Sequence, residues 1–227
     1  MAFPTVAATA TSFNPDHLTN HIVSLPANIA AGNLLIIFFR GGMAGVAATP
    51  AGWTLLCSRD TSSVFRRVAD GAEGATVTVT TAWNGRSAHV TFRITNQDPV
   101  NFIAGAFTGA DSLDPPNLAP GWGIADILWL TSASGRRTNY AFTCPANYGN
   151  QLNAQSLANS GDNVHVLLSV ARRNLTIDAE NPATWTFAGA GSPMNSHAST
   201  VGVQGTAGSL AQVSEPMGAK LIAGRLI

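Results

Sequence analysis

The chain has 227 residues, of which 45% are hydrophobic and 11% are charged, and its twelve acidic residues balance its twelve lysines and arginines. This length and apolar content exclude a disordered chain and allow a substantial buried core. A net charge of zero also lacks the positive field of proteins that bind nucleic acid or anionic membranes. We therefore expect neither nucleic acid nor a membrane among its partners.

The start of the chain, MAFPTVAATATSFNPD, has no basic segment followed by an apolar run. We therefore expect that the chain lacks a cleaved secretion signal and that it is made in a cytoplasm. The longest apolar run, Leu34 to Phe39, is too short to span a bilayer. Cys57 and Cys144 are too few to staple a fold of this size or to build a four-ligand zinc site, and we interpret both as buried small apolar residues.

Strand patterns dominate the first half of the chain. Short segments rich in Val, Ile, Thr, Phe and Trp are separated by Gly, Pro, Asn and Asp, which is typical of antiparallel strands. The dipeptides Asp70-Gly71 and Asn84-Gly85 tolerate positive φ and predict turns between strands. The predicted strands are His21 to Leu25, Asn33 to Arg40, Trp53 to Ser58, Ser63 to Ala69, Ala75 to Thr81 and Ala88 to Thr95.

Alternation along these segments predicts which side chains are buried. Leu34 to Phe39 has no polar face, which indicates a central strand covered on both sides. Several other segments, such as Ala75 to Thr80 and His89 to Ile94, have an apolar residue at every second position, so one face meets a core. The residues expected in the core are Val77, Val79, Val90, Phe92 and Ile94, together with Trp53, Trp129 and Trp185; Trp122, in a Pro-rich connection, is left open.

The second half repeats this order of patterns, with strands predicted at Ala125 to Ala133, Val164 to Arg173, Thr184 to Ala188 and Ser199 to Gln204. Three pairs of segments correspond: Asn33 to Ile36 with Asp126 to Trp129, Pro50 to Trp53 with Pro145 to Tyr148, and Val64 to Arg67 with Val170 to Arg173. Two interpretations stay open: a pseudo-duplication of four-stranded halves, or the general likeness of any two runs of strands.

The sequence therefore predicts an all-β fold, a jelly-roll or related Greek-key β-sandwich, because four strands alone cannot bury both of their faces. We expect a single domain over residues 1–227, whose halves are joined by Asp111 to Gly123. Residues 1–14 and 208–227 carry little charge and are predicted either as extended arms that add to another subunit or as frayed ends.

The segments AGNLLIIFFRGG, TPAGWTLL, SVFRRVADGAEGATVTVT, ADILWLTSAS, PANYGNQ and VLLSVARRN resemble a group of mostly uncharacterised proteins of tailed bacteriophages and prophages, over roughly Ala30 to Val203. The resemblance implies a virion or virion-associated protein with a jelly-roll-like fold, on capsid surfaces, tails or fibres. It implies no catalytic residues. Such a protein assembles in the host cytoplasm, in agreement with the predicted lack of a signal.

No pattern of catalytic or metal-binding residues stands out, so we expect no enzyme and no cofactor. His17 and His21 stand four apart, but a strand or loop would separate their rings. Serine is abundant, yet no G-x-S-x-G elbow singles out a nucleophile. Asp111, Asp114 and Asp126 are interpreted as loop and turn residues and not as a glycosidase pair.

The aromatic residue most suited to a contact is Trp83, which directly precedes the predicted Asn84-Gly85 turn. Trp83, Asn84 and Arg86 form a candidate contact tip for a protein partner or a glycan. The alternative, which we favour, is that Trp83 packs onto its own hairpin, because tryptophan is highly buried on average.

Two functions follow from these observations. The first is a non-enzymatic structural component of a tailed-phage virion, a capsid decoration or a tail protein, that binds other virion proteins and copies of itself. The second is an adhesin that recognises host surface glycans through loop aromatic and Asn or Asp side chains.

Overall fold

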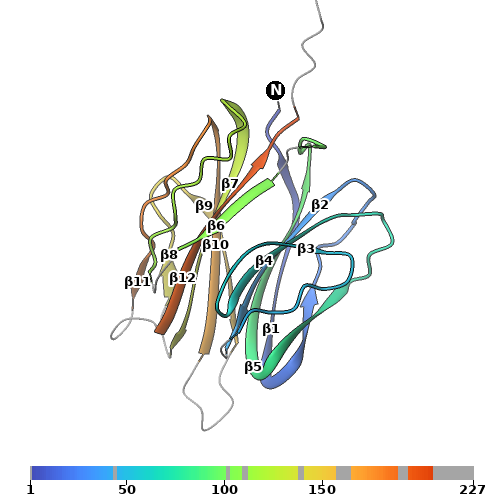
Figure 1. Ribbon diagram of the computed structural model, residues 1–227, viewed down its shortest axis with the longest axis vertical. Coiled ribbons are helices and arrows are strands. Elements are labelled where there is room, and N and C mark those ends of the chain that lie inside the picture. The colour runs from blue at the N-terminus through green and yellow to red at the C-terminus, as the bar shows by residue number, and fades with distance from the viewer. Residues whose placement is uncertain are drawn as a thin grey trace, which may run out of the picture.

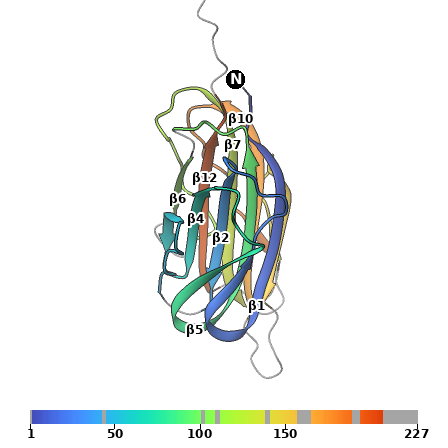
Figure 2. The same cartoon turned by 90° about the vertical axis from the view of Figure 1, so that its right-hand side faces the viewer.

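The computed structural model describes residues 2–42, 45–100, 103–108, 112–137, 141–156, 165–188 and 194–206. Within these residues the chain forms twelve strands and no helix, and every strand pair is antiparallel (Figure 1). Two five-stranded sheets lie face to face as a sandwich (Figures 1 and 2). The predicted all-β sandwich is confirmed.

Each sheet takes its strands from one half of the chain. The first sheet has the order β1-β5-β2-β4-β3, and the second has the order β6-β12-β7-β10-β9. The first sheet consists of β1 (Thr5–Ser24), β2 (Leu34–Gly41), β3 (Thr54–Arg59), β4 (Ser62–Val68) and β5 (Thr76–Thr95). The second consists of β6 (Ile103–Phe107), β7 (Ala125–Arg137), β9 (Gly149–Ser156), β10 (His165–Ile177) and β12 (Met194–Gln204), while β8 (Ala141–Thr143) pairs with β11 (Thr186–Ala188).

The strand order is the same in both sheets once β8 and β11 are left out: first, last, second, fourth, third. Because the strands of each sheet are contiguous in the sequence, the jelly-roll assignment is not confirmed. Turns before β3 and β9 also match, since the Trp53 and Tyr148 N–H groups donate to Pro50 and Pro145 oxygens over 3.1 Å each. The pseudo-duplication stays an interpretation, which these recurrences favour.

The register corrects the correspondence between β2 and β7 by one residue. Arg67 lies opposite Leu35, and Arg173 lies opposite Trp129. Matching these pairs gives an offset of 129 − 35 = 94, whereas the sequence comparison gave 126 − 33 = 93. A slip of one residue exchanges the two faces of a strand, so only the larger offset matches inward residues with inward residues.

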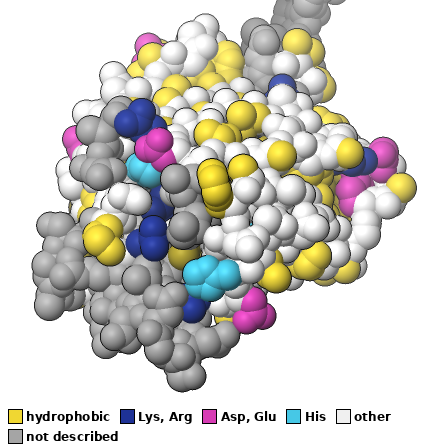
Figure 3. All heavy atoms as spheres, turned by 60° about the horizontal axis from the view of Figure 1, so that its bottom comes forward, with side chains coloured by type: hydrophobic (Ala, Val, Ile, Leu, Met, Phe, Trp, Pro, Cys, Tyr) yellow, Lys and Arg dark blue, Asp and Glu magenta, His cyan; other side chains and the backbone are white. Residues whose placement is uncertain are grey.

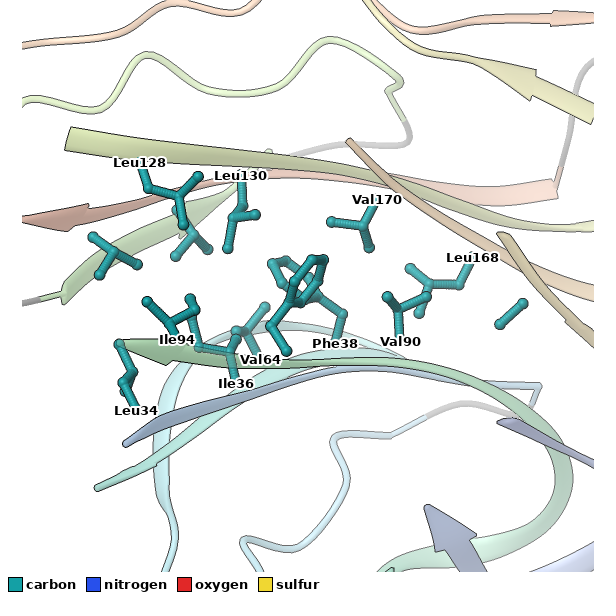
Figure 4. Packing of buried hydrophobic residues seen from close by; sticks show 14 of the residues in the cluster. Leu34, Ile36, Phe38, Val64, Val90, Ile94, Leu128, Leu130, Leu168 and Val170 are labelled. Atoms are coloured by element: carbon teal, nitrogen blue, oxygen red, sulfur yellow. The ribbon is translucent and has the colours of Figure 1, made fainter. Parts of the chain in front are cut away.

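The core lies between the inner faces of the two sheets. Figure 4 shows apolar side chains from β2, β4 and β5 meeting those from β7 and β10. Phe38 and Phe92 pack edge to face at its centre, with ring centroids 5.9 Å apart. Of the residues predicted in the core, Val79, Val90, Phe92 and Ile94 are buried and Val77 is partly buried.

Both outer faces are covered as well. On the first sheet, Leu35, Ile37 and Phe39 are covered by Val23, near the end of β1, and Val79, near the start of β5. On the second, Trp129 and Trp185 pack with Phe142, Tyr148 and the partly buried Trp122. The prediction that Leu34 to Phe39 is covered on both sides is confirmed, as is the burial of Trp53, Trp129 and Trp185.

Several strand predictions are corrected. Residues 5–14, predicted as part of an arm, form the first half of β1 and pair with β5. Strand β5 continues through Asn84-Gly85, where a hairpin turn was predicted. Strands β6, β8 and β9 were not predicted, because they are short or polar and lack an alternating apolar pattern. Residues 208–227, the second predicted arm, lie outside the described residues.

The two cysteines are free. They were predicted to be buried, and the structure shows both as partly buried. Burial raises the pKa of Cys57 to about 12, so its thiol stays protonated and acts as an apolar group.

Replacement of the central Phe38 by Ala is expected to lower the free energy of unfolding by about 3–5 kcal/mol, because a large side chain is lost from a close-packed core. Urea denaturation measures this. Phe13, which is 44% exposed, provides a control of the same residue type, and Phe13→Ala should cost about 1 kcal/mol or less. Equal losses for both variants would contradict the position given to the core.

Candidate functional site

Strands β1 and β5 bend together at one end of the sandwich and fold back over the outer face of the first sheet. Figure 1 shows both strands turning at the lower end and rising again on the outer side. The pairing shifts register between Asn14 and Leu18 and again before Asn20, which loosens the ladder at the bend. We call the folded-back part, residues 18–24 and 76–84, the ribbon.

Buried Arg86 fixes this bend. Its Nε donates to the Pro15 carbonyl oxygen over 2.7 Å, and its own carbonyl accepts from the Gly42 N–H, also over 2.7 Å. The side chain is 5% exposed. Arg86 was predicted as a contact residue, but the bend turns it inward, so its visible role is to join β1 to β5.

The other two predicted contact residues lie at the surface of the bend. Trp83 is 62% exposed and Asn84 is exposed as well. The favoured alternative, that Trp83 packs onto its own hairpin, is wrong because no hairpin forms there. Trp83 instead lies beside Gly45: a Cβ atom placed on this glycine would be 3.7 Å from the indole Cδ1, which is van der Waals contact.

The outward side of the ribbon is an uncharged surface. Segment 45–48 runs along it, since the Ala48 N–H donates to the Thr80 oxygen over 2.8 Å. Apolar side chains stand out between threonines, notably Ile22, which is 49% exposed. We define the ribbon face as Leu18, Asn20, Ile22, Val46, Thr78, Thr80 and Trp83, all of them exposed.

Figure 3 views the molecule from this end. In this view Arg, Asp, Glu and His side chains gather on the left and toward the lower centre, whereas the right-hand part is mostly uncharged apart from its far edge.

A chain of hydrogen bonds lies beneath the ribbon. Ser12 Oγ is 2.9 Å from His89 Nδ1, His89 Nε2 is 2.7 Å from Ser87 Oγ, and Ser87 Oγ is 2.7 Å from His21 Nδ1. His21 Nε2 is in turn 3.0 Å from Thr81 Oγ1. Burial lowers the pKa of His21 to about 4 and that of His89 to about 3, the latter helped by the neighbouring His21. Both imidazoles are therefore neutral at pH 7.

A second cluster brings buried serine and histidine together with an exposed aspartate. Ser62 Oγ is 3.1 Å from His197 Nδ1, and His197 Nε2 is 3.4 Å from Asp60 Oδ2. Arg40 Nη1 donates to the same Nδ1 over 2.8 Å, so this nitrogen acts as an acceptor. A serine nucleophile needs a basic nitrogen to take its proton, and here a guanidinium already occupies that nitrogen. Ser62 is also 2% exposed, and we interpret the cluster as structural.

A seam runs along one side of the sandwich, where the edge strands β1 and β9 face each other (Figure 2). Two hollows open along this seam. The upper one, of about 350 Å³, is lined by Phe3, Thr5, Asn150, Arg172, Arg173 and Asn174, with Pro4, Val6 and Leu128. The lower one, of about 360 Å³, is lined by Thr11, Ser12, Phe13, Asn153, Ala154 and Gln155. None of these residues was predicted from the sequence as part of a binding site.

The described residues hold no group of three His, Cys, Asp or Glu side chains placed to bind a metal ion. Both His17 and His21 lie in β1, the first exposed and the second buried. Asp114 and Asp126 accept hydrogen bonds from Thr184 and Thr176, while Asp111 lies outside the described residues. No helix in the described part of the chain is long and apolar enough to cross a membrane.

Acid is expected to destabilise the protein through the two neutral histidines. Their folded pKa values lie below the ordinary value of 6.5, so stability is complete above pH 6.5 and falls as the pH drops toward about 4. The loss from His89 alone is on the order of 2 kcal/mol at pH 5. Urea denaturation at pH 7 and pH 5 measures it.

His89→Gln separates the contribution of His89 from that of His21, whose lowered pKa gives a loss of stability in the same direction. The variant should lose less stability than the wild type between pH 7 and pH 5. An unchanged pH dependence would mean that His89 is protonated in the folded protein.

Comparison of the chain with protein-family models, curated proteins and solved structures found no match. The ribbon face and the seam are therefore the two surfaces from which a function is inferred.

Proposed function

We propose that the protein is a non-enzymatic structural component of a tailed-phage virion, which binds copies of itself or neighbouring virion proteins through the ribbon face. The resemblance of its strand and turn segments supplies the phage context. The ribbon face supplies the contact surface. The proposal leaves open whether the protein lies on the capsid surface or on the tail.

The observation that carries this proposal is the exposure of large apolar side chains on a surface without charge. Leu18, Ile22, Val46 and Trp83 are each more than two-fifths exposed. Large apolar side chains exposed on one face favour a site that another protein covers, and depletion of charge is typical of the centre of such interfaces. A backbone already paired on both sides of β5 gives this surface a rigid support.

A lysine introduced on the ribbon face should dissociate the assembly. Ile22→Lys and Val46→Lys are each expected to lower the mass in solution toward the 23.5 kDa of one chain, because an interface must then bury an unpaired ammonium group. Light scattering and negative-stain imaging measure mass and symmetry. Val100→Lys is the control, since Val100 is exposed but lies outside the ribbon face. A wild-type chain that is monomeric and absent from purified phage particles would contradict the proposal.

A second candidate function is glycan binding at the seam, which the polar lining of the two hollows favours. Asn and Gln side chains donate and accept hydrogen bonds as sugar hydroxyls require, and Phe3 and Phe13 add aromatic surface. The seam and the ribbon face lie on different sides of the first sheet, so one chain can carry both functions.

Trp83→Ala distinguishes the two surfaces. The variant is expected to weaken assembly by removing the most exposed aromatic side chain of the ribbon face, while its retention on host polysaccharide, where the wild type has any, stays unchanged. Affinity chromatography and light scattering on the same preparation measure both properties. Loss of polysaccharide retention with intact assembly would instead assign Trp83 and Asn84 to the glycan.

A further inference from the structure

Arg172 carries a charge that no described residue compensates. It follows Leu168 and Val170 along the inward-facing side of β10, so its guanidinium enters the space between the sheets where the seam opens. Its Nη1 is buried without a hydrogen-bond partner, and Arg172 forms no ion pair with the described part of the chain.

The adjacent arginine and its counterpart in the first sheet are both paired with acids. Arg173 points to the opposite face, pairs with the carboxylate of Glu180 and lies over the Tyr148 ring, 4.7 Å from its centroid. In the first sheet, Arg67 pairs with Glu73 over 2.8 Å. Arg172 has no such acid, although burial lowers its pKa and so opposes its charge.

Arg172 is partly buried, and a buried N–H group without a partner is costly because its lost hydration is not replaced. Arginine does not release its proton at any ordinary pH, so the charge persists. An anion bound in the hollow would supply both the missing hydrogen bonds and the missing charge. The planar guanidinium suits a carboxylate, which it binds with two parallel hydrogen bonds.

The hollow around Arg172 also contains groups that can bind the uncharged part of a ligand. Asn150, Asn174 and Thr5 line the same hollow and provide amide and hydroxyl groups, while Phe3 offers an aromatic side chain. Asn150 adopts a positive φ of 49°, a conformation favoured by asparagine at bends. The volume of about 350 Å³ is at the lower end of the range for small-ligand sites and suits one or two sugar rings.

The seam continues beyond this hollow. From Thr5 to Phe13 strand β1 extends over about 26 Å, at the usual rise of a strand. Asn153 and Gln155 of β9 line the lower hollow with Thr11 and Ser12 of β1. A line of amides and hydroxyls favours a polymer of hydroxylated units over a peptide, whose side chains would need apolar pockets.

We propose that the upper hollow of the seam binds the carboxylate-bearing sugar of an acidic saccharide. Arg172 binds the carboxylate, and Asn150 and Asn174 bind ring hydroxyls. The inference rests on the second candidate function, glycan binding, and is independent of assembly through the ribbon face.

Isothermal titration of the full chain with tetragalacturonate tests the proposal, with neutral maltotetraose and inorganic sulfate as parallel probes. Tetragalacturonate should bind, and maltotetraose and sulfate should bind at least tenfold more weakly. Arg172→Gln should weaken tetragalacturonate binding at least tenfold, and Asn174→Ala severalfold. Arg66→Gln is the matched control, because Arg66 precedes Arg67 in β4 as Arg172 precedes Arg173 in β10 and does not line the seam hollows.

The stability of Arg172→Gln separates ligand binding from a structural role. Removal of a partly buried charge that no acid compensates should leave the urea midpoint unchanged or raise it. A lower midpoint together with unchanged tetragalacturonate binding would make Arg172 a structural residue and overturn the proposal.

The other outcomes are equally decisive. Equal binding of maltotetraose overturns the carboxylate assignment while the glycan-binding function stands. Equal binding of sulfate overturns the saccharide as the ligand. Hexaglutamate, an acidic peptide titrated in the same way, overturns it if it binds more tightly than tetragalacturonate. Absence of binding to every probe overturns both the inference and the second candidate function.

Discussion

The constraint on which the structure depends is that its central strands are apolar on both faces. Leu34 to Phe39 of β2 and the matching part of β7 send large side chains to either side, so a two-layer sandwich would leave one side of each sheet in water. The exposed area of such a face would offset much of what the inner core contributes. Each sheet therefore needs an outer cover.

The two halves of the chain meet this need with different segments. The first sheet is covered by extending and bending its own strands, β1 and β5, which become the ribbon. The second is covered by the connection around Leu113, Leu118 and Trp122 and by β8 and β11. A cover made of strands has a second face of its own, and this is how an apolar, uncharged surface comes to lie outside.

Those parts of the fold that follow from alternation could be predicted from the sequence. Val90, Phe92 and Ile94 repeat at every second position, and β2 is a continuous apolar run. Strand β1 could not be found this way, because its alternation of Ala and Thr carries almost no contrast between faces. Asn84-Gly85 has the residues of a hairpin turn, but pairing with the bend of β1 keeps β5 extended through it.

The candidate surfaces were harder to predict because they depend on contacts between residues that are far apart in the sequence. Exposure of Trp83 depends on the bend, which is a long-range event between residues about seventy positions apart, as the contact of Arg86 with Pro15 illustrates. Arg172 and Arg173 are neighbours that differ only in which face they point to. A sequence without the register cannot tell which of them meets Glu180 and which enters the seam.

Overall neutrality of the chain consequently says little about its local charge. The acids that lie close to arginines, Asp60, Asp70, Glu73 and Glu180, sit in loops after the strands or on the outer covers. No strand of the seam brings a carboxylate to Arg172, since β1 has its only acid, Asp16, at the bend and β9 has none. Positive charge thus remains where the sheets part, whereas the ribbon face has no charge at all. The two proposed functions therefore use surfaces of different chemistry: an apolar, uncharged face for a protein partner and a polar, positively charged seam for an acidic saccharide.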